Sequence, residues 1–189
     1  MVVTHSIAAE RLTLEEFLQL PETKPAREYI DGKIVQKPMP QGEHSRIQSR
    51  LCTEVNKVGE SQKLALALTE IRCTFGQRSV VPDLAVFAWE RIPQTETGRL
   101  ANKFTIAPDW TIEILSPDQS TTKVIDNILF CLQQGTKLGW LIDSEEESVM
   151  IFKPNCLPEI KSGEEMLPAI ACLADWQLSS REIFAWLMF

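Results

Sequence analysis

Apolar residues recur along the chain in two different patterns, and the two patterns predict helices and strands. From Gly42 to about Gly59 they return every three or four positions, which is the period of a helix with one buried face. Short runs dense in apolar residues predict buried strands at residues 64–75, 80–89, 110–115 and 138–142. The order of these elements predicts a mixed sheet flanked by helices, in the α/β or α+β class.

Capping and turn residues predict where the other elements begin and end. The pairs Thr13 with Glu16 and Ser179 with Glu182 match the capping box, which predicts a short first helix and a last helix running to Phe189. The remaining predicted elements are a hairpin over 27–35 with an Asp-Gly turn, a turn at 116–120, a helix from Ser120 to about Gly135, an acidic turn at 143–147, a strand at 149–153 and a long surface loop at 90–108.

The composition is that of a soluble globular protein. The 189 residues are 44% hydrophobic and 24% charged, which we interpret as a single domain over residues 1–189 with a real core. No apolar stretch reaches the roughly 18 residues that a membrane helix requires, so no membrane partner is expected. Residues 1–6 lack the basic start and apolar core of a signal peptide, and a cytoplasmic location is therefore expected.

Cysteine usage and net charge give little support to a zinc-binding, a disulfide-rich or a strongly basic nucleic-acid-binding protein. The five cysteines are scattered without C-x-x-C spacing and there are only two histidines, so neither a structural zinc site nor a disulfide framework is expected. The formal charge of −7 argues mildly against nucleic-acid binding, although a local basic patch can coexist with an acidic remainder. The basic residues considered for such a patch are Lys33, Lys37, Arg46, Arg50, Arg72 and Arg78.

Two carboxylates stand where apolar runs predict buried strands. Asp83 lies at the head of one run, and Glu113 lies inside another. An ionised carboxylate buried in a strand costs several kcal/mol unless a partner neutralises it. A divalent cation held by both side chains is the simplest such partner.

Lys123 is the first candidate for a cationic group beside these carboxylates. It lies in the first turn of the helix that follows Glu113, where the helix dipole disfavours a positive charge. An ammonium close to a metal-bound carboxylate could orient a water or stabilise charge that develops on a phosphate. The alternative is a lysine that faces solvent and pairs with nothing.

Several short motifs, in one order along the chain, resemble the Uma2 family. They are Glu28-Tyr29-Ile30-Asp31-Gly32-Lys33-Ile34, His44, Pro82-Asp83, Glu113-Ile114-Leu115-Ser116-Pro117 and Gly139-Trp140-Leu141-Ile142-Asp143. The resemblance covers a core of about residues 10–155, followed by a C-terminal strand and helix at 156–189. It implies a restriction-endonuclease-like fold of the PD-(D/E)XK superfamily and Mg²⁺-dependent cleavage of DNA. The Uma2 family that the chain resembles is abundant in cyanobacteria.

The resemblance also assigns roles residue by residue. Asp83 matches the aspartate of the PD element, Glu113 the acid of the (D/E)XK element, Glu28 the glutamate before the hairpin, and His44 the histidine of the following helix. The lysine of the motif is missing, because its position is Leu115 and the alternative family position on the next helix is Asn127. Lys123 lies one helical turn before Asn127 and on the same face, so it is the expected replacement.

The implied chemistry is hydrolysis of a phosphodiester with Mg²⁺ or Mn²⁺. Asp83, Glu113 and a main-chain carbonyl near Ile114 would bind the cation, and Glu28 would complete its surroundings. Lys123 would position or deprotonate the attacking water, and His44 would contact the phosphate or support a ligand. Two simpler interpretations stay open. His44 could be structural, as a histidine on a helix usually is, and Glu28 could pair with Arg27 or Arg46.

Two functions of different class follow, and the sequence does not decide between them. The first is a metal-dependent DNA endonuclease, expected to act as a homodimer because cutting two strands needs two sites. The second is a nuclease-fold module, weak or inactive in catalysis, that binds DNA or protein; an unrelated hydrolase of small molecules is a more distant third. The apolar C-terminal residues would cover the core or form the dimer interface: Trp176, Phe184, Trp186, Leu187 and Phe189.

Overall fold

The computed structural model describes residues 12–117 and 119–189. The predictions that concern residues 1–11 and Asp118, among them the start of the core and part of the 116–120 turn, lie outside these ranges. The helices are α1 (Leu14–Leu18), α2 (Gly42–Gly59), α3 (Thr121–Gln133) and α4 (Ser180–Ala185). The strands are β1 (Arg27–Ile30), β2 (Lys33–Gln36), β3 (Ala65–Thr69), β4 (Cys73–Phe75), β5 (Arg78–Val80), β6 (Leu84–Ala88), β7 (Trp110–Ile114), β8 (Leu138–Asp143), β9 (Ser148–Phe152) and β10 (Glu159–Ser162).

The main sheet has six strands in the order β10-β9-β8-β7-β6-β3. All neighbouring pairs in it are antiparallel except β7 and β8, which run parallel with Trp110 opposite Leu138. A parallel pair needs a crossover connection, and α3 supplies it. The predicted mixed sheet with flanking helices is what the structure shows.

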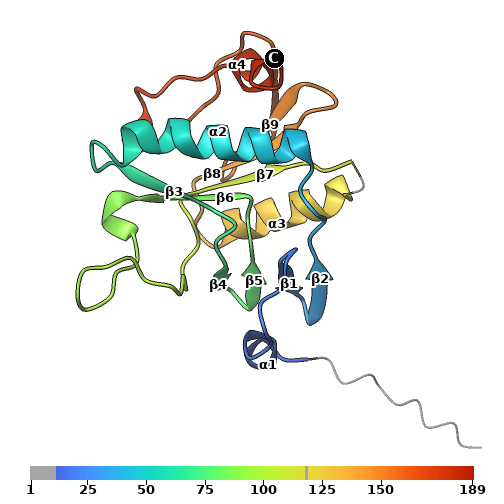
Figure 1. Ribbon diagram of the computed structural model, residues 1–189, viewed down its shortest axis with the longest axis vertical. Coiled ribbons are helices and arrows are strands. Elements are labelled where there is room, and N and C mark those ends of the chain that lie inside the picture. Colours follow the sequence, from blue (N-terminus) through green and yellow to red (C-terminus); the bar gives the residue numbers. More distant parts are fainter. Residues whose placement is uncertain (1–11, 118) are drawn as a thin grey trace, which may run out of the picture.

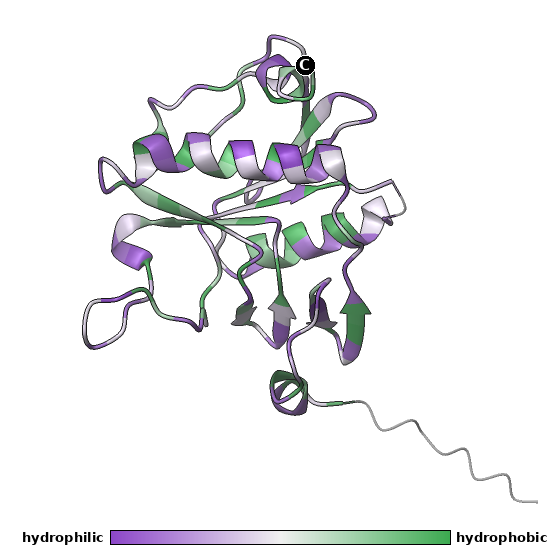
Figure 2. Cartoon of the chain, viewed as in Figure 1, coloured by the Kyte–Doolittle hydropathy of each residue, from purple (hydrophilic) through white to green (hydrophobic). Residues whose placement is uncertain are grey.

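The two long helices cover opposite faces of the main sheet (Figure 1). Side chains alternate between the faces of a strand, so Ile112 and Ile114 of β7 pack in the cluster that includes Leu51 of α2. Glu113, which lies between them, therefore points to the α3 side. Figure 2 shows hydrophobic residues along much of α3, whereas α2 alternates between polar and apolar positions. No described helix is both long and apolar enough to cross a membrane.

A second sheet of four short strands, in the order β2-β1-β5-β4, lies beside α3 (Figure 1). The predicted hairpin forms its outer half, with Glu28 opposite Val35. Asp31 and Gly32 turn the chain with φ of 50° and 80°, the left-handed values that a tight hairpin turn requires. The hairpin therefore places the segment after β2 next to the main sheet.

The runs at 64–75 and 80–89 are not the single strands predicted from them. The chain leaves β3 at Glu70, where φ is 49°, and the remainder of the first run becomes β4 in the other sheet. The second run is divided in the same way between β5 and β6. Apolar content alone could not reveal these breaks, because the apolar residues on both sides of each break are buried or half-buried.

The C-terminal segment is part of the main core. Leu167, Ile183 and Phe184 belong to the same hydrophobic cluster as Trp110 and Trp140. The last helix begins at the predicted Ser179 capping box but ends at Ala185, so the prediction that it runs to Phe189 was too long. Phe189 is fully exposed. The segment thus covers the core, one of the two roles considered for it, and leaves its final residues at the surface.

Candidate active site

Asp83 and Glu113 lie next to each other at the point where the two sheets meet. β6 and β7 pair with Leu84 opposite Ile112, so the next residues outward along the two strands are Asp83 and Glu113. Both side chains are buried, and the residues are 2% and 4% exposed. Like charges in such a pair repel each other, and a cation between them would relieve the repulsion.

Hydrogen bonds hold both the side chain and the main-chain oxygen of Asp83. Its Oδ2 accepts from the backbone N–H of Ile114 at 2.7 Å and lies 3.1 Å from Nε2 of His44. Its main-chain oxygen accepts from the side-chain amide of Gln48 at 2.9 Å and from the N–H of Glu70. An ionised carboxylate can only accept, so Nε2 of His44 carries a proton. Asp83 therefore stands in one orientation before any ligand arrives.

The cation between the two carboxylates is Lys37. Its Nζ lies 2.7 Å from Oδ1 of Asp83 and 3.3 Å from Oε2 of Glu113, and it donates to the main-chain oxygen of Val81 at 2.7 Å. Only 12% of its side chain is exposed. In the sequence Lys37 is one of several basic residues, and its position between the carboxylates was not predicted, because the contacts join segments far apart in the chain.

Glu28 reaches the site from β1 and is part of the same network. Its Oε1 accepts from the backbone N–H of Val81 at 2.7 Å, and its Oε2 accepts from Nδ2 of Asn127 at 3.2 Å. Among the described residues it forms no ion pair with Arg27 or Arg46, which donate to main-chain oxygens elsewhere. Glu28 thus links the small sheet to α3 immediately beside Asp83.

The acidic side chains of the site have opposite pKa shifts. Burial favours the neutral form of Asp83, but the charge of Lys37 and the hydrogen bond from His44 outweigh it and hold its pKa well below the ordinary value. Burial raises the pKa of Glu113 to about 8, and Lys37 offsets this only in part. Burial also raises the pKa of Glu28. For Lys37, burial is outweighed by the surrounding carboxylates, which raise its pKa.

Lys123 is in the first turn of α3 as predicted, and its side chain is exposed. It makes no hydrogen bond or ion pair with another side chain in the described part of the chain. Asn127, one turn further on, points inward and contacts Glu28. The structure therefore brings together Asp83, Glu113, Glu28, His44 and Ile114, and the lysine found among them is Lys37 rather than Lys123.

The donor set of this site fits a hard divalent cation. Oδ1 of Asp83 and Oε2 of Glu113 both approach one point, occupied by the Lys37 ammonium, so they already surround a positive charge. Carboxylate oxygens are the ligands that Mg²⁺ uses, usually one or two at a time with waters completing the shell. Within residues 12–117 and 119–189 no group of three or more histidine, cysteine or acidic side chains is arranged to hold a metal. The chain alone therefore offers a two-carboxylate site, not a closed cage.

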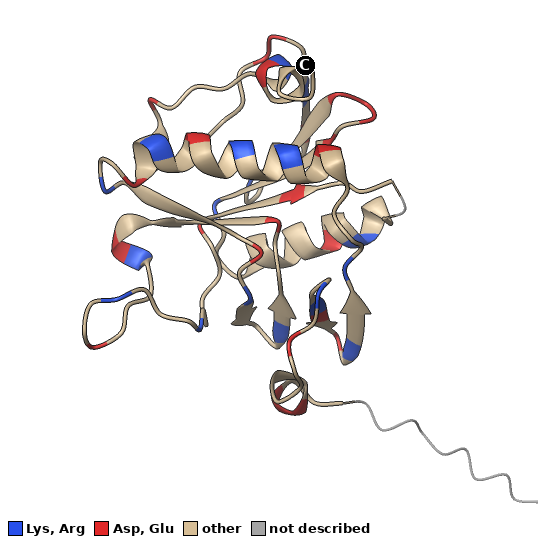
Figure 3. Ribbon diagram, in the orientation of Figure 1, with Lys and Arg blue, Asp and Glu red and all other residues tan. Residues whose placement is uncertain are grey.

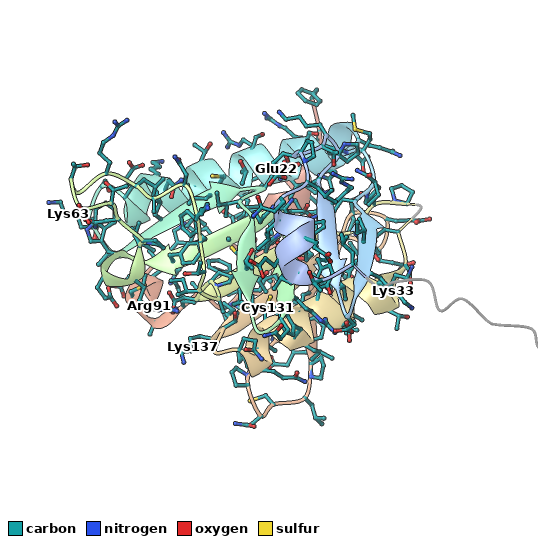
Figure 4. The ribbon with its side chains drawn as sticks, turned by 90° about the horizontal axis from the view of Figure 1, so that it is seen from below. Glu22, Lys33, Lys63, Arg91, Cys131 and Lys137 are labelled. Atoms are coloured by element: carbon teal, nitrogen blue, oxygen red, sulfur yellow. The ribbon has the colours of Figure 1, made fainter. Side chains whose placement is uncertain are left out.

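The basic residues near the site are largely neutralised by acidic neighbours. Arg72 pairs with Glu22 at 2.7 Å, and Arg78 pairs with Asp31 at 2.7 Å and Asp126 at 2.8 Å. Figure 3 shows basic and acidic residues interspersed around the small sheet and along α2. In Figure 4, Lys33 lies at one side of the molecule, and Lys63 and Arg91 lie at the other. The surface charge thus gives no separate sign of a nucleic-acid interface.

Comparison with known proteins identifies the family. The sequence model of the Uma2 family, described as "Putative restriction endonuclease", matches residues 14–181. The chain belongs to the Uma2 family. No curated protein matches it.

A solved relative of this Uma2 protein has the same fold. It is described as a "putative nuclease belonging to DUF820", from Anabaena variabilis ATCC 29413, and shares 54% sequence identity. The match covers 93% of this chain and 99% of the other, with a TM-score of 0.92. The family and fold inferred from the sequence motifs are therefore confirmed.

Proposed function

We propose that this Uma2 protein is a divalent-metal-dependent DNA endonuclease. The observation that carries the proposal is the convergence of two buried carboxylates, Asp83 and Glu113, on one cation position. A stable core has no need of such an arrangement, because apolar residues at these places would avoid the cost of burying the charges. Membership of a family described as "Putative restriction endonuclease" supports the same function.

We assign a different role to each residue of the site. Asp83 and Glu113 would hold Mg²⁺ or Mn²⁺, which when bound polarises a phosphate and acidifies a water. His44 and the Ile114 N–H hold Asp83 in place by donating hydrogen bonds to its Oδ2. Glu28, anchored by the Val81 N–H, lies on the α3 side of the site and would orient water there.

DNA and a second copy of the chain are the proposed partners. Cleavage of both strands of a duplex needs two sites, which a homodimer supplies. The exposed C-terminal Met188 and Phe189, at 79% and 106% exposure, are compatible with such an interface. Light scattering of the purified protein measures this directly, and a mass of one chain at working concentration would exclude the dimer.

Plasmid cleavage tests the proposed function. Wild-type protein with Mg²⁺ or Mn²⁺ should nick or cut supercoiled DNA, and Asp83→Asn and Glu113→Gln should each lower the rate by about 100-fold or more. The matched control is Asp109→Asn, another buried carboxylate, which bonds Ala88 and Arg91 away from this site. Equal loss in the control would assign the effect to damaged folding.

A second candidate is a nuclease-fold module that binds without cutting. It is favoured by the pairing of Arg72 and Arg78 with acidic residues and by the exposed position of Lys123. Failure of folded wild-type protein to cut duplex, single-stranded and branched DNA, with either metal, would select the module. Cleavage that depends on Asp83 would exclude it.

A further inference from the structure

We infer that Lys37 is the built-in occupant of the cation position: its ammonium bridges Asp83 and Glu113 in the metal-free protein and, when a divalent cation takes those oxygens, moves to the phosphate of the substrate. The inference rests on the proposed function and adds to it the cationic group that the motif lacks. It also means that cation binding at this site is an exchange, in which one positive charge leaves the carboxylates as another arrives.

The contacts of Lys37 support an exchange. Its Nζ touches the same two oxygens that a metal would need, Oδ1 of Asp83 at 2.7 Å and Oε2 of Glu113 at 3.3 Å. Two positive charges cannot share that position, because like charges at such distances repel each other strongly in a buried site. A cation that binds both oxygens must therefore displace the ammonium.

The charge of the cluster explains why a lysine is buried here. Glu28, Asp83 and Glu113 bring three carboxyl groups together, and Lys37 is the one lysine or arginine among the described residues that contacts two of them. Without Lys37 the free protein would have no fixed positive charge beside them. A divalent cation would supply that charge, so Lys37 is needed in the cluster only while the metal is absent.

The position of Lys37 allows a short movement toward a substrate. The backbone is held by the bond from its N–H to the main-chain oxygen of Ala26 at 2.9 Å, directly after the β1–β2 hairpin. The side chain carries four flexible methylenes and is 12% exposed, so one side of it reaches solvent. The ammonium can leave the carboxylates while the chain that carries it stays fixed.

Metal binding without DNA is the first measurement. Calorimetry with Ca²⁺ or Mn²⁺, repeated over about pH 7–9 because Glu113 of the wild type releases its proton in this range, compares wild type with Lys37→Met, Lys37→Arg and the control Lys57→Met. Lys57 is exposed on α2, about 20 Å along the helix from His44. Removal of the competing charge should make Lys37→Met bind the cation about 10-fold or more tightly, whereas Lys57→Met should match wild type.

DNA binding and cleavage are the second measurement. In Ca²⁺, loss of the phosphate contact should weaken duplex binding by Lys37→Met about 10-fold. In Mg²⁺, its single-turnover cleavage should fall about 100-fold despite the tighter metal binding. Lys37→Arg keeps the positive charge, so its DNA binding and its cleavage should each fall less than those of Lys37→Met. This opposite movement of metal affinity and cleavage would not arise from a structural role.

A rescue variant guards against misfolding of Lys37→Met. The side chain of Asn127 reaches Glu28 from α3, so Asn127→Lys in the Lys37→Met background would return an ammonium to the cluster from another element. We expect it to recover at least about 10-fold of the lost cleavage. Recovery of melting temperature without recovery of cleavage would show that Lys37 is only a structural counter-ion.

The outcomes separate this inference from the proposed function. If wild type cuts DNA and Lys37→Met cuts as fast, the protein is a nuclease and the inference is wrong. If wild type cuts nothing, the proposed function fails, and the inference then depends on the binding data. Tighter metal binding with weaker Ca²⁺-dependent DNA binding in Lys37→Met would support it, and unchanged or lost metal binding in a folded variant would overturn it.

Discussion

At the scale of the residue, neighbouring carboxyl groups behave differently because their hydrogen bonds differ. Asp83 accepts from Lys37, His44 and the Ile114 N–H. Burial favours its neutral form, but the charge of Lys37 and the hydrogen bond from His44 outweigh burial and keep its pKa below the ordinary range. Glu113 is equally buried, but among the described residues only Lys37 donates to its carboxylate, at 3.3 Å, so burial raises its pKa to about 8. One group is thus fixed as an anion, while the other holds a proton near neutral pH until a cation arrives.

The stability of the metal-free protein should depend on the proton of Glu113. The pKa of Glu113 is about 8 in the folded chain and 4.5 in the unfolded chain. Between these two pH values the folded state keeps a proton that the unfolded state has released. The free energy of unfolding should therefore fall as pH rises from 4.5 to 8, by at least about 1 kcal/mol. Urea unfolding in EDTA at several pH values measures this decline.

Glu113→Gln is the matched variant, because glutamine resembles the protonated acid. It should show a smaller decline over the same window and be more stable than wild type near pH 8. Glu28, whose pKa is also raised, leaves a residual slope. Parallel curves for variant and wild type would contradict the assigned pKa of Glu113. Asp83 and Lys37 do not contribute to the decline in the free energy of unfolding over this pH range, because their shifted pKa values lie outside it.

At the scale of the element, α3 carries Asn127 to the site because it packs closely on β8. Gly139 of β8 makes the close approach possible, since a Cβ there would overlap Cγ2 of Ile128. Gly139→Ala should therefore lower the free energy of unfolding by about 1–3 kcal/mol.

Gly42→Ala is the control, because a Cβ at the start of α2 meets nothing within 4 Å. It should change stability by no more than about 1 kcal/mol, and in the favourable direction. Denaturant unfolding under one condition compares the two variants. Equal effects at the two glycines would show that α3 and β8 are not in the described close contact.

The elements were predictable where local signals define them. The capping boxes at Thr13 and Ser179 and the turn at Asp31-Gly32 are all present in the structure. The division of residues 64–75 between two sheets was not predictable, because it depends on a left-handed turn at Glu70 that an apolar run does not encode. The end of the last helix at Ala185 was missed for a similar reason, since apolar residues continue beyond it.

At the scale of the whole molecule, the site exists only because two sheets and two helices meet. Strand positions and the family motifs predicted that Asp83, Glu113, Glu28 and His44 would gather, and in the structure they do. Lys37 was not predictable, because its neighbours in sequence form an ordinary hairpin end, whereas its partners Asp83 and Glu113 lie just before β6 and on β7. Lys123 illustrates the converse, since its spacing placed it on a suitable helix turn but its side chain is exposed.

The measurement that tests the central claim most directly is the position of Mn²⁺ in a crystal of the wild-type protein, located by its anomalous scattering. We predict one ion between Oδ1 of Asp83 and Oε2 of Glu113, at distances from these oxygens near the roughly 2.1 Å typical of Mg²⁺ sites. Nζ of Lys37 should be displaced from both oxygens. Lys37 still bridging the two carboxylates at saturating Mn²⁺, with the ion bound elsewhere or nowhere, would contradict it.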